Sequence, residues 1–340
     1  MNNFAAVGLA GAAGLAVTAG LGFAMIPWLR KLKFGQTILD IGPKWHKSKQ
    51  GTPTMGGLMF VIGTVAAIAV TVITDKLTGG DIVASGSLVP SEMYTRLWSG
   101  LVMALSFGLI GFADDYIKIV RGRNLGLTIK QKTLAQLLVC VAYLMGLYMS
   151  MDGAPYMFVP FVGMVEIGFF HWIFGIVIIY ASVNAVNFTD GVDGLCSSVT
   201  VTAAVSLGVI AGLKGLFGFS MAAAALAGAC VGFLFWNKNP AKVFMGDTGS
   251  MFLGGMVVAL AYALGCPLIL LLAGVVYVVE GASDVLQIVY YRVTGGKRIF
   301  KMAPIHHHFE LCGWSEKKIV AVFSAVNALG GAAAVAIMYY

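Results

Sequence analysis

The chain has 340 residues, of which 59% are hydrophobic and only 11% are charged, and its mean hydropathy is +0.88. A soluble globule cannot bury so much apolar surface, so the composition excludes a soluble protein and predicts an integral membrane protein. The net charge of +7 could suggest nucleic-acid binding, but in a membrane protein it is more typical of the cytoplasmic face, and we expect no nucleic-acid partner.

Apolar segments long enough to cross a bilayer recur along the whole sequence. The first has no basic residues before it, so we interpret it as a retained span and not as a signal peptide. No internal repeat divides the chain. We therefore predict an all-α bundle of about ten transmembrane helices forming one catalytic domain, residues 1–340. The expected spans are 3–28, 54–73, 96–112, 134–151, 168–186, 196–213, 216–236, 250–265, 267–290 and 319–340.

Lysine and arginine predict the orientation of this bundle. All but three of the 22 basic residues lie in connections that follow odd-numbered spans, and the three exceptions are Lys76, Arg96 and Lys214. Because positive charge is retained on the cytoplasmic side, these connections are predicted to face the cytoplasm and both termini the outside.

The first polar cluster, residues 47–57, comes just before the second span. Lys49 offers an ammonium group, Thr54 a hydroxyl, and the start of a helix offers free backbone N–H groups, all of which suit phosphate oxygens. The alternative is a basic loop that only sets the orientation.

Adjacent acids end the third span. Asp114 and Asp115 raise each other's pKa unless a cation or a metal compensates, and Lys118 lies one helical turn further on. Lys130 and Lys132 follow in the same connection. This pattern predicts a catalytic or metal-linked pair, with interfacial ion pairing as the alternative.

Amides and acids alternate after the fifth span. Asn184, Asn187, Asp190 and Asp193 recur every three residues, and their connection has no lysine or arginine to balance the two acids. A helical continuation would place them along one stripe. The pattern favours recognition of a polar ligand or a metal.

The connection after the seventh span, residues 237–250, holds another acid at the start of a helix. Asp247 is either a ligand or a helix cap. Asn237 adds an amide, and Phe244 could stack on a planar ring or pack against lipid.

Three consecutive histidines, His306, His307 and His308, follow the ninth span. Consecutive side chains point in different directions and cannot all bind one ion, so a zinc site is disfavoured. We expect imidazoles that clamp a diphosphate. Glu280 and Asp284 lie within the ninth span, and either line the site or form hydrogen bonds between helices.

Together these clusters predict a site for a polyanion and a divalent cation. Mg²⁺ is the expected cofactor because it is held by one or two carboxylates together with substrate phosphates. Such a site favours phosphoryl transfer between a membrane lipid and a soluble, charged metabolite. No GxxxxGK[ST] sequence is present, which disfavours ATP hydrolysis. A proton-coupled transporter is the alternative outside enzymes.

Five motifs carry a resemblance over residues 31–314: GTPTMGG, FADDYIK, NAVNFTDGVDGL, FMGDTGS and MAPIHHHFE. In this order they resemble the bacterial phospho-N-acetylmuramoyl-pentapeptide transferases of the polyprenyl-phosphate N-acetylhexosamine-1-phosphate transferase superfamily. The resemblance implies that UDP-N-acetylmuramoyl-pentapeptide and undecaprenyl phosphate give lipid I and UMP in peptidoglycan synthesis. It also implies Mg²⁺, a homodimer, and a bacterial plasma membrane with the active-site cleft facing the cytoplasm. A transferase for UDP-N-acetylglucosamine is the alternative within the superfamily.

The resemblance also assigns roles to positions that match the motifs. It implies catalytic roles for Asp114, Asp115, Asp247 and His306. It implies metal binding by Asp247, with Asn187 as a second candidate. The expected substrate-binding residues are Lys49, Thr54, Lys118, Lys130, Asn184, Asn187, Asp190, Asp193, Asn237, Phe244, His307 and His308. The roles of Glu280 and Asp284 stay open.

Overall fold

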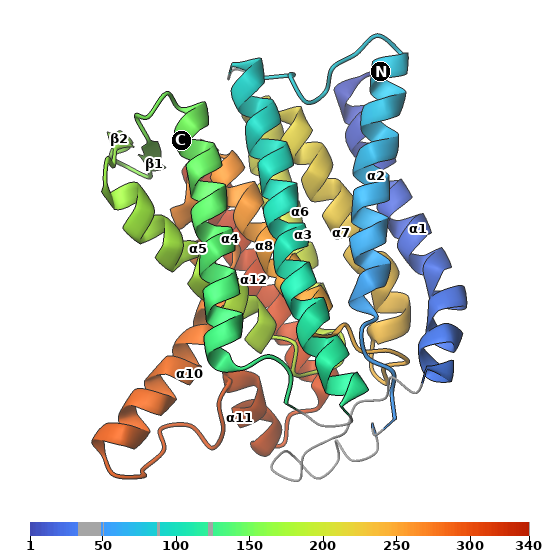
Figure 1. The fold of residues 1–340 in the computed structure, drawn as a ribbon, viewed down its shortest axis with the longest axis vertical. Coiled ribbons are helices and arrows are strands. Elements are labelled where there is room, and N and C mark those ends of the chain that lie inside the picture. The colour runs from blue at the N-terminus through green and yellow to red at the C-terminus, as the bar shows by residue number, and fades with distance from the viewer. Residues whose placement is uncertain (33–48, 50, 87–88, 122–124, 340) are drawn as a thin grey trace.

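The computed structural model describes residues 1–32, 49, 51–86, 89–121 and 125–339. Within this part of the chain, helices make up almost all of the regular structure (Figure 1). The long ones are α1 (Asn3–Lys31), α2 (Gly57–Leu77), α3 (Pro90–Val120), α4 (Ile129–Ser150), α5 (Phe170–Phe188), α6 (Leu195–Leu213), α7 (Phe217–Asn237), α8 (Gly246–Ala263), α10 (Val275–Val293) and α12 (Glu316–Tyr339).

Shorter elements connect them. An antiparallel hairpin of β1 (Tyr156–Val159) and β2 (Gly163–Glu166) joins α4 to α5. The 3₁₀ helix η2 (Pro267–Ile269) and α9 (Leu270–Ala273) precede α10, and α11 (Ile305–Leu311) precedes α12.

The expected fold class, an all-α integral membrane protein, is confirmed. Among the described residues, eight helices, α1 to α7 and α12, are long and apolar enough to cross a membrane. Segment 267–290 was expected as one span, but the helices on either side of Gly274 are bent by 90° relative to each other. Gly274 has a φ of −125° and a ψ of 31°, outside the helical region, and the low helix propensity of glycine makes this break inexpensive. Counting this bent pair gives nine candidate spans, while α8 occupies the remaining expected segment.

Both ends of the chain lie at one end of the bundle, and α10 and α11 lie at the other (Figure 1). Which end faces the cytoplasm remains a prediction from the distribution of lysine and arginine.

Helix α8 is buried from Thr248 to Ala263 and lies against α3. The two helices approach closely because small residues face each other. A Cβ atom added at Gly111 would lie 2.2 Å from the carbonyl oxygen of Asp247, and one at Gly255 would lie 2.6 Å from the Cα of Ala104. Small residues allow such backbone contact between membrane helices. This contact places the first residues of α8 beside the last turns of α3.

Candidate active site

Three carboxylates from two helices converge at the end of the bundle opposite the termini. Asp114 and Asp115 lie in the last turns of α3, and Asp247 is the second residue of α8. Each offers an oxygen atom within 4.8 Å of the others. The close packing of α3 against α8 therefore brings together acids that are 132 residues apart in sequence.

Asp115 caps the N-terminus of α8. Its two oxygens accept hydrogen bonds from the backbone N–H groups of Asp247 (3.2 Å) and Thr248 (2.9 Å) and from the Thr248 hydroxyl (2.7 Å). Gly246 turns into the helix with a φ of 71°, and a Cβ there would lie 2.5 Å from Asp115 and 2.9 Å from the Thr54 hydroxyl. Because both of its oxygens are occupied, Asp115 fixes the position of Asp247.

Two lysines neutralise part of this negative charge. Lys118 Nζ lies 2.6 Å from Asp114 and 3.2 Å from Asp247, and Lys132 Nζ lies 2.8 Å from Asp247. Lys130 was expected to contact phosphate, but its side chain is exposed and forms no ion pair with any described carboxylate. The structure therefore places Lys132, and not Lys130, at the carboxylate cluster.

The connection between α5 and α6 adds amide and carboxyl groups to the cluster. Asn187 donates hydrogen bonds to Asp247 (3.0 Å) and to Ser250 (2.8 Å). Asp190 is partly exposed to solvent. Partial burial removes much of the water around its carboxyl group, and this is the largest cause that raises the pKa of Asp190 well above its usual value. The negative charges of Asp247 and Asp115 raise this pKa further. The three clustered carboxylates of Asp114, Asp115 and Asp247 thus face two lysines, and this excess of negative charge would attract a divalent cation.

Asp193 belongs to a second, neighbouring cluster. Lys49 Nζ lies 2.8 Å from Asp193 and 2.7 Å from Glu316, and the Asn239 amide donates to both acids. The backbone N–H of Ala241 also donates to Asp193. Lys49 and Asp193 were expected from the sequence, whereas Glu316 was missed. Its only signal was an acid in the first turn of a helix on the basic side of the bundle.

Two of the predicted amides, Asn184 and Asn237, form hydrogen bonds to the backbone and to other side chains of the protein. Asn184 exchanges hydrogen bonds with Gln136 and donates to the carbonyl of Tyr180. Asn237 is buried and links the Gly194 N–H to the Val243 carbonyl. In the structure, therefore, both amides tie loops and helices together.

Phe244 connects two predicted clusters through its backbone. Its N–H donates to the carbonyl of Pro53, and its carbonyl accepts from the N–H of Gly56, both at 2.8 Å. These bonds hold Thr54 beside Gly246. The Phe244 side chain is partly exposed, which leaves it free to contact a ligand.

The three histidines have three different partners. Nδ1 of His306 lies 3.0 Å from Glu280, Nδ1 of His307 lies 2.6 Å from Glu310, and Nδ1 of His308 accepts the backbone N–H of Lys301. The rings therefore do not converge on one point.

His306 is the histidine that faces the carboxylate-bearing connection. It is fully buried, as is Glu280, and its Nε2 has no hydrogen-bond partner among the described residues. A Cβ added at Gly191 would lie 2.1 Å from this Nε2, so the ring packs directly against the backbone next to Asp190. Glu280, whose role the sequence left open, thus orients His306 toward the site.

Two family models match parts of this chain. The profile of Glycosyl transferase family 4 matches residues 97–265, and the Phospho-N-acetylmuramoyl-pentapeptide-transferase signature 1 matches residues 49–61. The first match spans both Asp114 and Asp247, and the second includes Lys49 and Thr54.

Curated relatives match almost the whole chain. Phospho-N-acetylmuramoyl-pentapeptide-transferase from Listeria monocytogenes is 42% identical over 93% of this chain and 93% of its own length. The protein of the same name from Acetivibrio thermocellus is 44% identical over 91% of this chain and 88% of its own length. The one from Bacillus mycoides is 42% identical over 93% of this chain and 95% of its own length. Identity at this level along nearly the full length means that the chain belongs to the phospho-N-acetylmuramoyl-pentapeptide-transferase family.

Proposed function

We propose that this protein transfers phospho-N-acetylmuramoyl-pentapeptide from its UDP-linked form to undecaprenyl phosphate, giving lipid I and UMP in peptidoglycan synthesis. The observation that carries the proposal is the cluster of Asp114, Asp115 and Asp247 with two lysines at one end of a membrane bundle. The names of the curated relatives supply the substrate class. The site would face the cytoplasm of a bacterial plasma membrane, and a homodimer is expected from the family resemblance.

The donor atoms of the cluster suit Mg²⁺. Carboxylate oxygens from three residues lie within 4.8 Å of one another, and such hard oxygen ligands are those that Mg²⁺ prefers. Asp247 would hold the ion, with Asn187 beside it. When bound, Mg²⁺ would neutralise negative charge on the diphosphate of the donor.

The reaction exchanges one phosphoanhydride bond for another. An oxygen of the lipid phosphate forms a bond to the sugar-linked phosphorus, the bond from that phosphorus to the bridging oxygen breaks, and its electron pair leaves with UMP. Asp114 would keep the lipid phosphate fully ionised. Lys118 and Lys132 would turn from Asp247 toward the phosphate oxygens, and His306 would face the diphosphate.

Release of UMP by the purified protein tests this function. The protein receives polyprenyl phosphate, Mg²⁺ and either UDP-N-acetylmuramoyl-pentapeptide or UDP-N-acetylglucosamine, with Asp247→Asn as the inactive control. We expect release from the pentapeptide donor. Release from UDP-N-acetylglucosamine alone would instead identify the other transferase activity of the superfamily, and no release from either donor would contradict a transferase.

A further inference from the structure

Asn327 is a polar residue in the interior of α12, outside the clusters of the candidate site. Its side chain is fully buried within an otherwise apolar part of the helix. A buried amide destabilises a fold unless hydrogen bonds compensate it, and polar groups inside membrane spans often serve a function. The partners of Asn327 therefore indicate what it holds in place.

The amide of Asn327 bridges the break between α9 and α10. Its Oδ1 accepts the backbone N–H of Val276 (3.2 Å), and its Nδ2 donates to the carbonyl of Ala273 (3.1 Å). Ala273 is the last residue of α9, and Val276 is the second residue of α10. Helix ends leave such groups without partners inside the helix, and Gly274 between them has no side chain to cap them. One amide thus caps both helices where they bend by 90°.

Further contacts fix this amide and the break to the bundle. Nδ2 of Asn327 also donates to Thr202 Oγ1 on α6 (2.9 Å), and the Thr202 hydroxyl donates in turn to the Val199 carbonyl (2.8 Å). A Cβ added at Gly330 would lie 2.4 Å from the carbonyl oxygen of Leu272, so α12 contacts the backbone of α9 directly. The bend is therefore held by α6 and α12 together.

The direction of α10 decides where Glu280 lies. Glu280 is six residues beyond Gly274, about 9 Å along the helix axis. A change of about 10° at the break would move Glu280 by about 1.5 Å. Such a shift is enough to lose its 3.0 Å contact with Nδ1 of His306. Displacements of this size at a catalytic group can reduce a rate by about a hundredfold.

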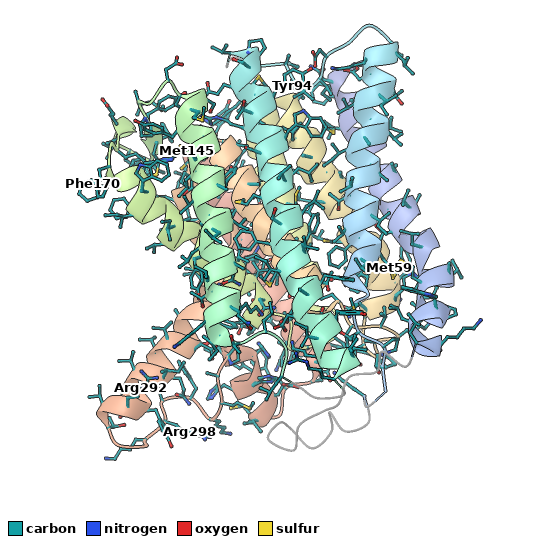
Figure 2. The ribbon with its side chains drawn as sticks, in the orientation of Figure 1. Met59, Tyr94, Met145, Phe170, Arg292 and Arg298 are labelled. Atoms are coloured by element: carbon teal, nitrogen blue, oxygen red, sulfur yellow. The ribbon has the colours of Figure 1, made fainter. Side chains whose placement is uncertain are left out.

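The segment after α10 is tied to this helix. Gln287 Oε1 accepts the backbone N–H groups of Ile299 (3.0 Å) and Phe300 (3.1 Å). Figure 2 shows Arg292, in the last turn of α10, at the edge of the molecule and away from the other long helices. A displaced α10 would therefore either lose its contact with His306 or carry this histidine away from the aspartates of the site.

We propose that Asn327 is a positioning residue for the transfer reaction. By capping both sides of the bend at Gly274, it holds α10 in the direction that keeps Glu280 on His306. Asn327 acts through these two residues and not on the substrate. This inference rests on the proposed function.

The first test removes the hydrogen bonds of Asn327 but keeps the size of its side chain. In Asn327→Leu, we expect kcat for UMP release to fall about tenfold because His306 is no longer held in place, while KM for either substrate changes by less than about twofold. Asn327→Ser retains a hydroxyl that both donates and accepts, so it should lose less of the rate. The serine variant also replaces the leucine variant if the latter does not fold.

A double-variant cycle separates positioning from a general loss of stability. Once Glu280 is replaced in Glu280→Gln, His306 has already lost the carboxylate that orients it. Asn327→Leu should then lower kcat by less than about threefold further. A general destabilisation would reduce kcat equally in both backgrounds.

Ser324 provides a matched control on the same helix. It lies three residues before Asn327, and its hydroxyl is buried with no hydrogen-bond partner in the part of the chain that the structure describes. Ser324→Ala should therefore leave kcat within about twofold of the unmodified protein.

Spin labels measure the bend without any substrate. Cys312 is the exposed cysteine, and it is replaced in Cys312→Ser before labels are attached through Ile129→Cys and Val293→Cys. These two exposed positions are the first residue of α4 and the last residue of α10. A change of about 10° at the break would move Val293 by about 5 Å. Asn327→Leu should shift or broaden the distance between the labels, and Ser324→Ala should not.

Four results would overturn the proposal. They are an unchanged kcat in Asn327→Leu, an equal loss in the Glu280→Gln background, a serine variant no faster than the leucine variant, and unchanged label distances. The proposed function fails separately, if the unmodified protein releases no UMP from the natural donor, and the label distances would still report on the bend.

Discussion

Arg96 and Asp115 lie on the same helix, α3, and bind opposite ends of α8. Arg96 donates to the carbonyls of Tyr262 (3.3 Å) and Ala263 (3.1 Å), while Asp115 accepts the first N–H groups of α8. Each charge has the sign that the adjacent helix terminus stabilises. The two contacts together fix α8 along its axis, and with it the depth of Asp247 in the site.

The cap made by Asp115 predicts a linked loss of stability and activity. In Asp115→Asn, one acceptor oxygen is replaced by an amide NH₂ that faces N–H and O–H donors, leaving at least one buried donor without a partner at a cost of about 1 to 3 kcal/mol. We expect a lower midpoint of thermal unfolding together with at least a hundredfold loss of UMP release. Asp247→Asn, whose side chain caps nothing, should lose activity without this fall in the midpoint. Equal midpoints for Asp115→Asn and the unmodified protein would argue against the cap.

The contacts of the two lysines on α4 predict unequal effects. Lys132→Ala removes the ion pair with Asp247 and should lower kcat by about tenfold or more. Lys130→Ala changes an exposed side chain two residues away, on another side of α4, and the rate should stay within about twofold of the unmodified protein. The rate of UMP release at saturating donor gives kcat for both variants. A larger effect at Lys130 would mean that α4 has a different rotation when substrate is bound.

The buried pair of Glu280 and His306 predicts non-additive mutations. Glu280→Gln should lower kcat by about tenfold with little change in KM, because His306 loses the carboxylate that orients it, and Glu280→Asp should restore part of the rate. When His306 is already alanine, Glu280→Gln should have little further effect on the remaining rate. Additive losses in the double variant would show that Glu280 acts independently of His306.

The raised pKa of Asp190 predicts how stability depends on pH. In metal-free buffer with EDTA, the folded protein holds this proton more tightly than the unfolded chain, whose Asp ionises near pH 4. Stability is therefore lost as the pH rises from about 4 through the pKa of the folded state. Asp190→Asn cannot ionise, so its unfolding midpoint should exceed that of the unmodified protein at pH 8, and the difference should shrink toward pH 4. A lower midpoint for the variant at pH 8 would contradict the prediction.

Sequence patterns were sufficient for the large-scale arrangement. Hydropathy predicted that α3 and α8 exist, although α3 extends from Pro90 to Val120, well beyond the expected 96–112. The distribution of charge predicted that Asp114, Asp115 and Asp247 would meet at one end of the bundle, and the structure brings them together. Segment 267–290 is apolar on both sides of Gly274, so its pattern did not reveal the break there, where the direction of the chain depends on tertiary packing.

Individual partners were harder to predict because they depend on helix rotation. Lys130 and Lys132 are separated by about 200° around a helix, so only one can face Asp247, and sequence does not say which. Glu316 reaches Lys49 from 267 positions away, and Asn184 pairs with Gln136 on another helix. Such pairs follow from packing between helices and have no local signal.

The absence of a side chain at Gly191 limits how this protein could evade an inhibitor. Even a methyl group at that position would fall 2.1 Å from Nε2 of His306, too close for any stable arrangement of the ring. A compound that approaches Nε2 across this backbone could not be excluded by a bulkier residue 191 unless the imidazole itself moved. Resistance by steric blocking at this point would therefore be obtained only at the expense of the enzyme's own histidine.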